Sequence, residues 1–174
     1  MTCVRRLGPD DAVAVRDIRL EGLRLFPSSF GTSWEEECCQ PLSWWQNRLV
    51  GPARSLGAEV DGELAGILSV SLNLRVKLAH NAEIGAVYVR PAFHRRGVAT
   101  LLMQSAMETL RSGEFAHRAK FATLNVTAGN DSARRLYERF GFTVCGQLER
   151  ELCVDGIFYD ELLMRTGLSQ PLPF

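Results

Sequence analysis

A short basic loop that leads into a helix is the part of this sequence best suited to bind a polyanion. An apolar run ends at Val89-Arg90-Pro91, and His94-Arg95-Arg96-Gly97 then leads into a helical pattern that begins at Val98. A helix that begins here presents free backbone N–H groups beside two guanidinium ions, and such helix N-termini bind phosphates. The segment therefore predicts a pyrophosphate site, although it contains neither G-x-x-x-x-G-K-[ST] nor a G-x-G-x-x-G that follows a strand.

A second segment, from Asn130 to Phe142, combines a helix cap with a tyrosine on an apolar helix face. Ala133, Leu136, Tyr137 and Phe140 recur at i, i+3, i+4 and i+7, which places them on one side of a helix. Asn130 stands where an N-cap belongs, and its amide suits a helix cap and a bond to a ligand equally well. Tyr137 is either a core aromatic residue or a phenol that donates a proton to a reacting group. An ordinary tyrosine, with a pKa near about 10, is protonated at neutral pH and fits the second role.

The composition indicates one globular domain without a general affinity for polyanions. The 174 residues contain 20 Lys and Arg against 20 Asp and Glu, so the net charge gives no case for nucleic acid or an anionic membrane as a partner. No apolar run approaches the roughly 18 residues of a membrane span, and the N-terminus lacks an export signal. Five cysteines without paired C-x-x-C spacing indicate a reduced, cytoplasmic protein with no metal site. We expect a single domain over residues 1–166 and a loose tail over 167–174.

The hydrophobic pattern predicts strands and helices that position both segments. We expect strands at Cys3–Leu7, Leu56–Val60, Glu63–Leu74, Ala82–Val89, Phe121–Thr127, Val144–Val154 and Ile157–Met164. We expect helices from Asp10 or Asp11 to Leu25, at Trp34–Cys39 continuing over Ser43–Val50, at Val98–Arg111 and at Ser132–Phe140. This order predicts an α+β fold with a mixed, mostly antiparallel sheet of about seven strands, flanked by about four helices.

These residues carry a resemblance to the GNAT acetyltransferase superfamily. His94-Arg95-Arg96-Gly97-Val98-Ala99 resembles its acyl-CoA signature [QR]-x-x-G-x-[GA], with His94 where Gln or Arg is preferred. Asn130 to Phe142 is similar to N-x-x-A-x-x-L-Y-x-x-x-G-F at every named position. The element order is also that of the family, so the chain is identified as a member from Cys3 to Met164, and the resemblance implies the GNAT fold.

The resemblance implies an N-acetyltransferase that takes its acetyl group from acetyl-CoA and transfers it by direct attack of an amine in a ternary complex. It implies that the backbone of Val87 and Val89 binds the pantetheine amides and that the Val87 N–H donates to the thioester oxygen as charge develops there. Tyr137 would donate a proton to the leaving sulfur. The residues expected to contact the cofactor are Val87, Tyr88, Val89, His94, Arg95, Arg96, Gly97, Val98, Ala99, Thr100, Asn130 and Tyr137.

The general base and the acceptor are less closely specified. Glu83, at the start of the cofactor-binding strand, is the first candidate for the base; a solvated carboxylate is the alternative. Asp160 and Glu161 are weaker candidates, and Asn125 stands where family members that acetylate protein N-termini carry a Glu. The acceptor amine stays open among small amines, amino acids, antibiotics and protein termini.

Several aromatic and acidic residues near the first helices bear on that acceptor. Trp44-Trp45 suits an apolar or cationic acceptor pocket, but adjacent helical residues point apart, so at least one is expected in the core. Glu35-Glu36-Glu37 suits a basic acceptor, although such a run is usually a solvated helix face. Homodimers are frequent in the resembling family. A non-catalytic module that binds or senses acyl-CoA is the alternative to an enzyme.

The histidine at position 94, where the family signature prefers Gln or Arg, leads to a separate prediction. An imidazole beside the phosphates contributes positive charge only when it is protonated. We therefore expect the affinity for acetyl-CoA to fall between about pH 6 and pH 8, measured as a dissociation constant across that range. An affinity that is constant over this range would place His94 outside the site.

Overall fold

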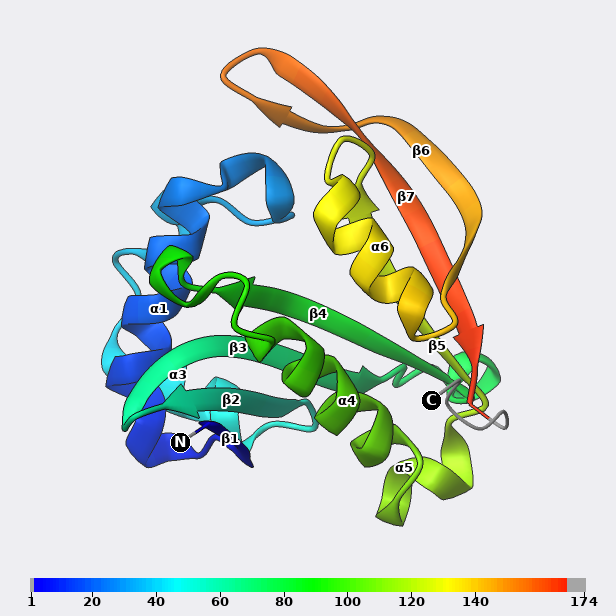
Figure 1. Cartoon of the computed structure of the whole chain (residues 1–174), viewed down its shortest axis with the longest axis horizontal. Coiled ribbons are helices and arrows are strands. Elements are labelled where there is room, and N and C mark those ends of the chain that lie inside the picture. The colour runs from blue at the N-terminus through cyan, green and yellow to red at the C-terminus, as the bar shows by residue number, and fades with distance from the viewer. Residues whose placement is uncertain (1, 169–174) are drawn as a thin grey trace.

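Seven strands form one mixed sheet in the order β1-β2-β3-β4-β5-β7-β6 (Figure 1). The computed structural model describes residues 2–168, apart from the side chain of Glu114. The strands are β1 (Thr2–Arg6), β2 (Arg54–Val60), β3 (Glu63–Leu72), β4 (Asn81–Val89), β5 (Phe121–Thr127), β6 (Thr143–Val154) and β7 (Ile157–Gly167). Every neighbouring pair is antiparallel except β4 and β5. The α+β class and the mostly antiparallel sheet are those expected from the sequence.

The helices are more numerous than the sequence pattern predicts. Within residues 2–168 they are α1 (Ala12–Leu25), α2 (Trp34–Glu37), α3 (Leu42–Val50), α4 (Val98–Leu110), α5 (Gly113–Arg118) and α6 (Asp131–Arg139), with 3-10 turns at Pro9–Asp11, Pro27–Ser29, Val76–Leu78 and Pro91–Phe93. The expectation of about four helices was too low for two reasons. Pro41 is the N-cap of α3 and separates it from α2, and α5 is too short to show a helical period.

The two faces of the sheet carry different helices and different core clusters. The larger cluster joins α4 and α6 to one face, through residues such as Leu102, Met103 and Tyr137. The smaller cluster joins α1 and α3 to the other face, through Ile18 and Trp45. Figure 1 shows α4 crossing in front of β2–β4, with α1 and α3 on the far side. Because side chains alternate along a strand, the sequence of each strand decides which residues meet which layer.

The parallel pair β4–β5 opens after a short contact. Only Asn81, Ala82 and Glu83 of β4 pair with β5, while β4 continues to Val89 and β5 to Thr127. Beyond the contact, β4 contains a bulge at which its register against β3 shifts, and Ala86 within it has a left-handed φ of 51°. A bulge bends its strand, so the two strands diverge toward their carboxyl ends (Figure 1). This partly unpaired end of β4 is what the GNAT resemblance implied.

At the other end of the chain, the last strand extends past the expected domain boundary at residue 166. Gly167 belongs to β7, and Leu168 is buried in the larger core cluster, where its N–H donates to the Lys120 carbonyl at 3.0 Å. Residues 169–174 of the expected loose tail lie outside the described residues. Across the described part of the chain, we find no helix with the length and apolar character that crossing a membrane requires.

Candidate active site

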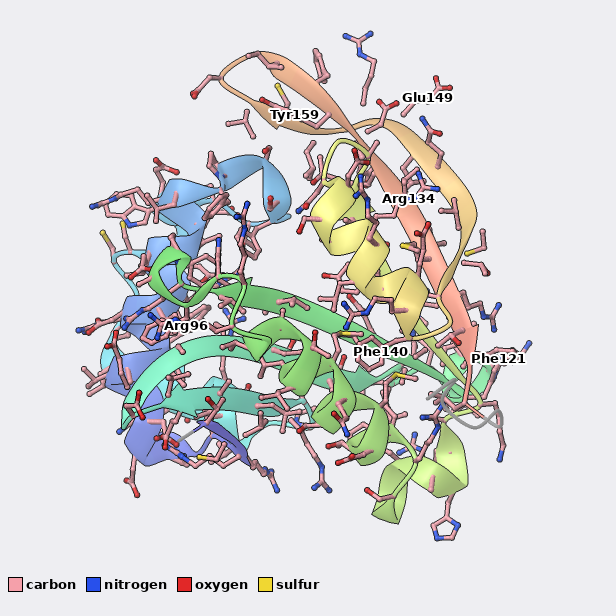
Figure 2. The ribbon with its side chains drawn as sticks, in the orientation of Figure 1. Arg96, Phe121, Arg134, Phe140, Glu149 and Tyr159 are labelled. Atoms are coloured by element: carbon pink, nitrogen blue, oxygen red, sulfur yellow. The ribbon has the colours of Figure 1, made fainter. Side chains whose placement is uncertain are left out.

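The loop between β4 and α4 forms the helix N-terminus that the basic segment predicts. Gly97 is the N-cap of α4 and has a φ of 77°, a left-handed conformation that glycine adopts without strain. No heavy atom lies within 4 Å of a Cβ built there, so the space beside its backbone is open. Arg95 and Arg96 are exposed in this loop, whereas Val98 is buried and anchors the helix. Figure 2 shows Arg96 in the loop that precedes α4.

A third arginine, absent from the sequence-based set, reaches the same helix end. The guanidinium of Arg139, the last residue of α6, donates to the Thr100 hydroxyl at 3.1 Å. This contact joins α6 to the first turn of α4, where positive charge favours a phosphate ligand. Arg139 occupies a variable position of the second motif and is 39 residues distant in sequence, so no local signal indicated it.

The backbone of β4 directs polar groups toward the opening between β4 and β5. The Arg90 N–H donates to the Ala65 carbonyl at 2.9 Å, and Val89 lies opposite Gly66. Since hydrogen-bonded and non-hydrogen-bonded pairs alternate along antiparallel strands, the Val89 N–H and C=O point away from β3. The bulge interrupts this alternation between Tyr88 and Gly85, so the orientation of Val87 remains what the GNAT resemblance implies. The Val89 N–H is therefore placed to bind an extended ligand as an added strand.

His94 and Tyr88 occupy this region in ways the sequence did not specify. The His94 Nε2 lies 2.8 Å from the Val89 carbonyl oxygen, so the ring is bonded to the end of β4. The Tyr88 side chain lies on the opposite face of the sheet, where its hydroxyl donates to Glu21 at 2.8 Å and its ring packs near Phe26 and Phe30. The N–H and C=O of Tyr88 point toward Ile67 of β3, because the polar groups of Val89 point away from it.

Tyr137 lies buried on the helix α6. The Asn130 side chain accepts from the Ala133 N–H at 3.1 Å, which confirms its role as a helix cap. Tyr137 is 6% exposed and meets Phe142 edge to face, with ring centroids 6.3 Å apart. Burial raises the pKa of Tyr137 to about 12, so the phenol keeps its proton throughout the neutral range. Tyr137 is thus both a core residue and a protonated acid.

Comparison with known proteins decides the family. Residues 19–142 match the acetyltransferase (GNAT) family, and this match covers well over half of the chain. The chain belongs to the GNAT family. This result confirms the family that the two motifs indicated, and at that level it confirms the interpretation of the chain as an N-acetyltransferase that uses acetyl-CoA.

Individual relatives agree with the assignment. An L-amino acid N-acetyltransferase from Escherichia coli (strain K12) is 28% identical over 122 residues, which cover 69% of this chain and 73% of that protein. A GNAT acetyltransferase from Streptococcus pneumoniae superposes with a TM-score of 0.82 at 20% identity, over 96% of this chain and 99% of the other. An acetyltransferase from Salmonella typhimurium, solved with its cofactor acetyl-CoA, superposes with a TM-score of 0.79 at 19% identity, over 98% of this chain and 96% of the other. These two structures confirm the fold.

The three carboxylates that are candidates for the general base in this GNAT chain differ in burial and in hydrogen bonding. Glu83 is exposed and is the last residue of β4 that pairs with β5, opposite Thr123. Its neighbours Ala82 and Ile84 face the α4 cluster, so Glu83 faces the side that carries α1 and α3. Glu161 is buried, and its Oε2 accepts from the Asn125 amide at 3.1 Å. Asn125 stands where some family members carry a Glu. Its amide therefore binds a carboxylate of β7.

Asp160 has a structural role instead. It accepts from the Arg150 N–H and from the Gln147 amide, each at 2.8 Å, within the projecting β6–β7 hairpin that Tyr159 and Glu149 mark in Figure 2. These two hydrogen bonds lower the pKa of Asp160, because both favour the charged carboxylate. The bonds use the oxygens that a base would need, so Asp160 is the weakest of the three candidates.

The acidic run before α3 is only partly a solvated face, because Glu37 is buried. It is 3% exposed and accepts two bonds from the buried Arg19, at 3.1 and 3.2 Å. The Arg48 guanidinium lies 3.3 Å from the same carboxylate. Burial alone would raise the pKa of Glu37, but the two arginines outweigh it and lower that pKa below its ordinary value. Two cations thus share one buried anion.

Proposed function

We propose that this GNAT chain transfers the acetyl group of acetyl-CoA to a primary amine by direct attack within a ternary complex. One observation carries the proposal: the parallel strands β4 and β5 separate after Glu83. Their carboxyl ends lead directly into the loop of Arg95 and Arg96 and into α6 with Tyr137. Arg139, two residues after Tyr137 on α6, reaches Thr100 in the first turn of α4, which supports placing the phenol and the phosphate-binding helix end in one site.

Each group in the opening suits one part of the transfer. Bound acetyl-CoA supplies an activated acetyl thioester. The N–H groups of the first turn of α4, with Arg95 and Arg96, neutralise the pyrophosphate, and Arg139 adds to this charge. The Val87 N–H donates to the thioester oxygen as negative charge develops on it.

The bond changes follow from that placement. The neutral amine nitrogen forms a bond to the acetyl carbon, and the carbon–sulfur bond breaks. The leaving sulfur takes the proton of the Tyr137 hydroxyl, and the proton lost by the amine passes to a carboxylate, directly or through water. The products are an amide and CoA with a free thiol.

Substitution of the carboxylates tests which one accepts the proton. We expect Glu83→Gln to lower kcat by about 10²-fold at neutral pH, the usual contribution of a general base, because the amide cannot accept a proton. The rate should recover as the pH approaches the pKa of the free amine, about 10.4 for an alkylamine, since the acceptor then loses its proton without help. The measurement is a pH–rate profile with saturating acetyl-CoA.

Two further variants make that result specific. Glu108→Gln removes an exposed carboxylate from α4 and should leave the profile unchanged. Glu161→Gln removes the buried carboxylate that Asn125 holds. If Glu161→Gln shows the loss and the alkaline recovery and Glu83→Gln does not, the base is Glu161 and Glu83 is a solvated residue.

Calorimetric titration with acetyl-CoA, followed by a thiol-release assay with a panel of amines, tests the activity as a whole. Saturable binding with release of CoA that depends on the amine supports the enzyme. Saturable binding without release for any amine supports the alternative, a module that binds or senses acyl-CoA. Absence of binding contradicts both. The relative named for L-amino acids makes amino acids the first acceptors to test.

The remaining proposals concern assembly and compartment. We propose a homodimer that uses β6, because β6 is an edge strand of the sheet and most of it is exposed. Ile157 and Phe158 beside it are 57% and 49% exposed, and unpaired edges with apolar residues favour association. Light scattering of the purified protein tests this.

A cytoplasmic location fits a free thiol pair, Cys38 and Cys39, with sulfurs 3.4 Å apart, because a reducing compartment keeps such thiols unbridged. Cell fractionation tests this location.

A further inference from the structure

A cavity of about 190 Å³ lies between the helices α1 and α3 and the sheet face that carries Glu83. Its walls are largely apolar, with Val15, Leu49 and Ile67 among them. Ser55 and Ser69, which pair with each other across β2 and β3, line its floor. The cavity also reaches Ala86, the bulged residue that directly precedes Val87. It therefore adjoins the strand position at which the Val87 N–H is placed to meet the thioester, from the face opposite α4.

Trp45 forms part of the apolar wall of this cavity. It is 1% exposed, and its indole Nε1, which has no hydrogen-bond partner among the described residues, is itself enclosed by protein. The indole ring therefore shapes the cavity, and the polar groups that a ligand can reach must come from other residues.

The charge on the cavity wall indicates which kind of ligand the cavity suits. Arg19 and Arg48 both line the cavity, and both contact the single carboxylate of Glu37. Two guanidinium ions against one carboxylate leave one positive charge uncompensated within the triad. Arg19 donates to Glu37 and Thr32 through its Nε and one terminal nitrogen, and it is only 8% exposed. The side chain of Arg48 is 46% exposed, so Arg48 is the cation that a ligand can reach.

We propose that this cavity binds the carboxylate of the acceptor, so that the substrates are amino acids and related amines that carry a carboxylate. The proposal rests on the acetyl transfer proposed above and identifies its acceptor class. Arg48 supplies both the counter-charge and the N–H donors for the carboxylate. The apolar walls accommodate an aliphatic or aromatic side chain, and the amino group lies toward Ala86 and Val87. A guanidinium binds a carboxylate through charge-assisted hydrogen bonds, which are stronger than those between neutral groups.

Matched pairs of acceptors test this directly. L-leucine and isopentylamine differ only in the carboxylate, as do L-phenylalanine and phenethylamine. We expect the wild-type protein to prefer each amino acid over its amine by at least about tenfold in kcat/KM, because a hydrogen bond to a charged group contributes about 1.5–3 kcal/mol and 1.4 kcal/mol is tenfold. Arg48→Gln should raise KM for the amino acid by about that factor and leave KM for the amine unchanged.

The controls separate this proposal from the activity itself. Arg24 is an exposed arginine of α1 that stacks on Trp34 at 4.6 Å, as Arg48 stacks on Trp44 at 4.6 Å; Arg24→Gln should preserve the preference. Arg48→Gln should fold, because the buried Arg19–Glu37 pair remains. Equal use of amines and amino acids, unaffected by Arg48→Gln, overturns the acceptor proposal while acetyl transfer stands. Bound acetyl-CoA that no acceptor discharges overturns both.

Discussion

Tyr137→Phe is expected to lower kcat for acetyl transfer by about 10²-fold or more, the usual contribution of a positioned general acid. The substitution removes one oxygen and leaves the ring that packs against Phe142. The leaving sulfur then departs as a thiolate without a proton donor. The dissociation constant of acetyl-CoA should stay nearly unchanged, because the pyrophosphate and the pantetheine are held by α4 and by the backbone of β4. Steady-state kinetics and calorimetry on the same preparation measure the two quantities.

The pKa of Tyr137 supplies a second readout for the same variant. Burial raises that pKa to about 12, against about 10 in an unfolded chain. The folded protein therefore binds this proton more tightly than the unfolded one does, and the resulting stability is lost as the pH rises from about 10 toward about 12. Tyr137→Phe should flatten this alkaline decline in unfolding free energy. A variant that keeps full kcat would remove Tyr137 from the chemistry and leave it as a core residue.

Local sequence signals predicted much of the fold because they act over a few residues. The dipeptides Asp61-Gly62 and Asp155-Gly156 form hairpin turns in which all four residues have positive φ, as such turns require. The strict alternation in Phe121–Thr127 predicted β5 to the residue. The two sequence motifs predicted helix starts at Gly97 and Asn130. These residues are the N-caps of α4 and α6.

Contacts between distant segments could not be predicted in this way. Glu37 belongs to an acidic run that resembles a solvated face, and its burial follows only from the positions of Arg19 and Arg48 in α1 and α3. The contact of Arg139 with Thr100 likewise depends on how α6 lies against α4. The residues proposed to bind the cofactor belong to helix ends and strand backbones, which local sequence predicts. The residues proposed to bind the acceptor meet only through tertiary packing, so no local sequence signal indicates them together.

Glu37→Gln is expected to lower the free energy of unfolding by about 3–5 kcal/mol, the typical cost of removing one partner from a buried ion pair. The substitution keeps the size of the side chain but leaves Arg19, which is 8% exposed, with a buried charge and no counter-ion. Chemical denaturation at neutral pH measures the loss. Glu138→Gln is the matched control, because Glu138 forms an exposed pair with Arg134 at 2.9 Å, and such pairs contribute about 0.3–0.5 kcal/mol.

The pH dependence of stability distinguishes a lost ion pair from a simple packing defect. Because Arg19 and Arg48 lower the pKa of Glu37 in the folded state, its contribution is complete above the unfolded value of about 4.3. That contribution is lost as the pH falls through the lower folded value. Wild type should therefore lose stability on acidification more steeply than Glu37→Gln, so the two curves converge at low pH. Parallel curves, or a loss no larger than that of Glu138→Gln, would mean that Arg19 and Arg48 are stabilised without this carboxylate, and the surplus positive charge assigned to the cavity wall would have to be reconsidered.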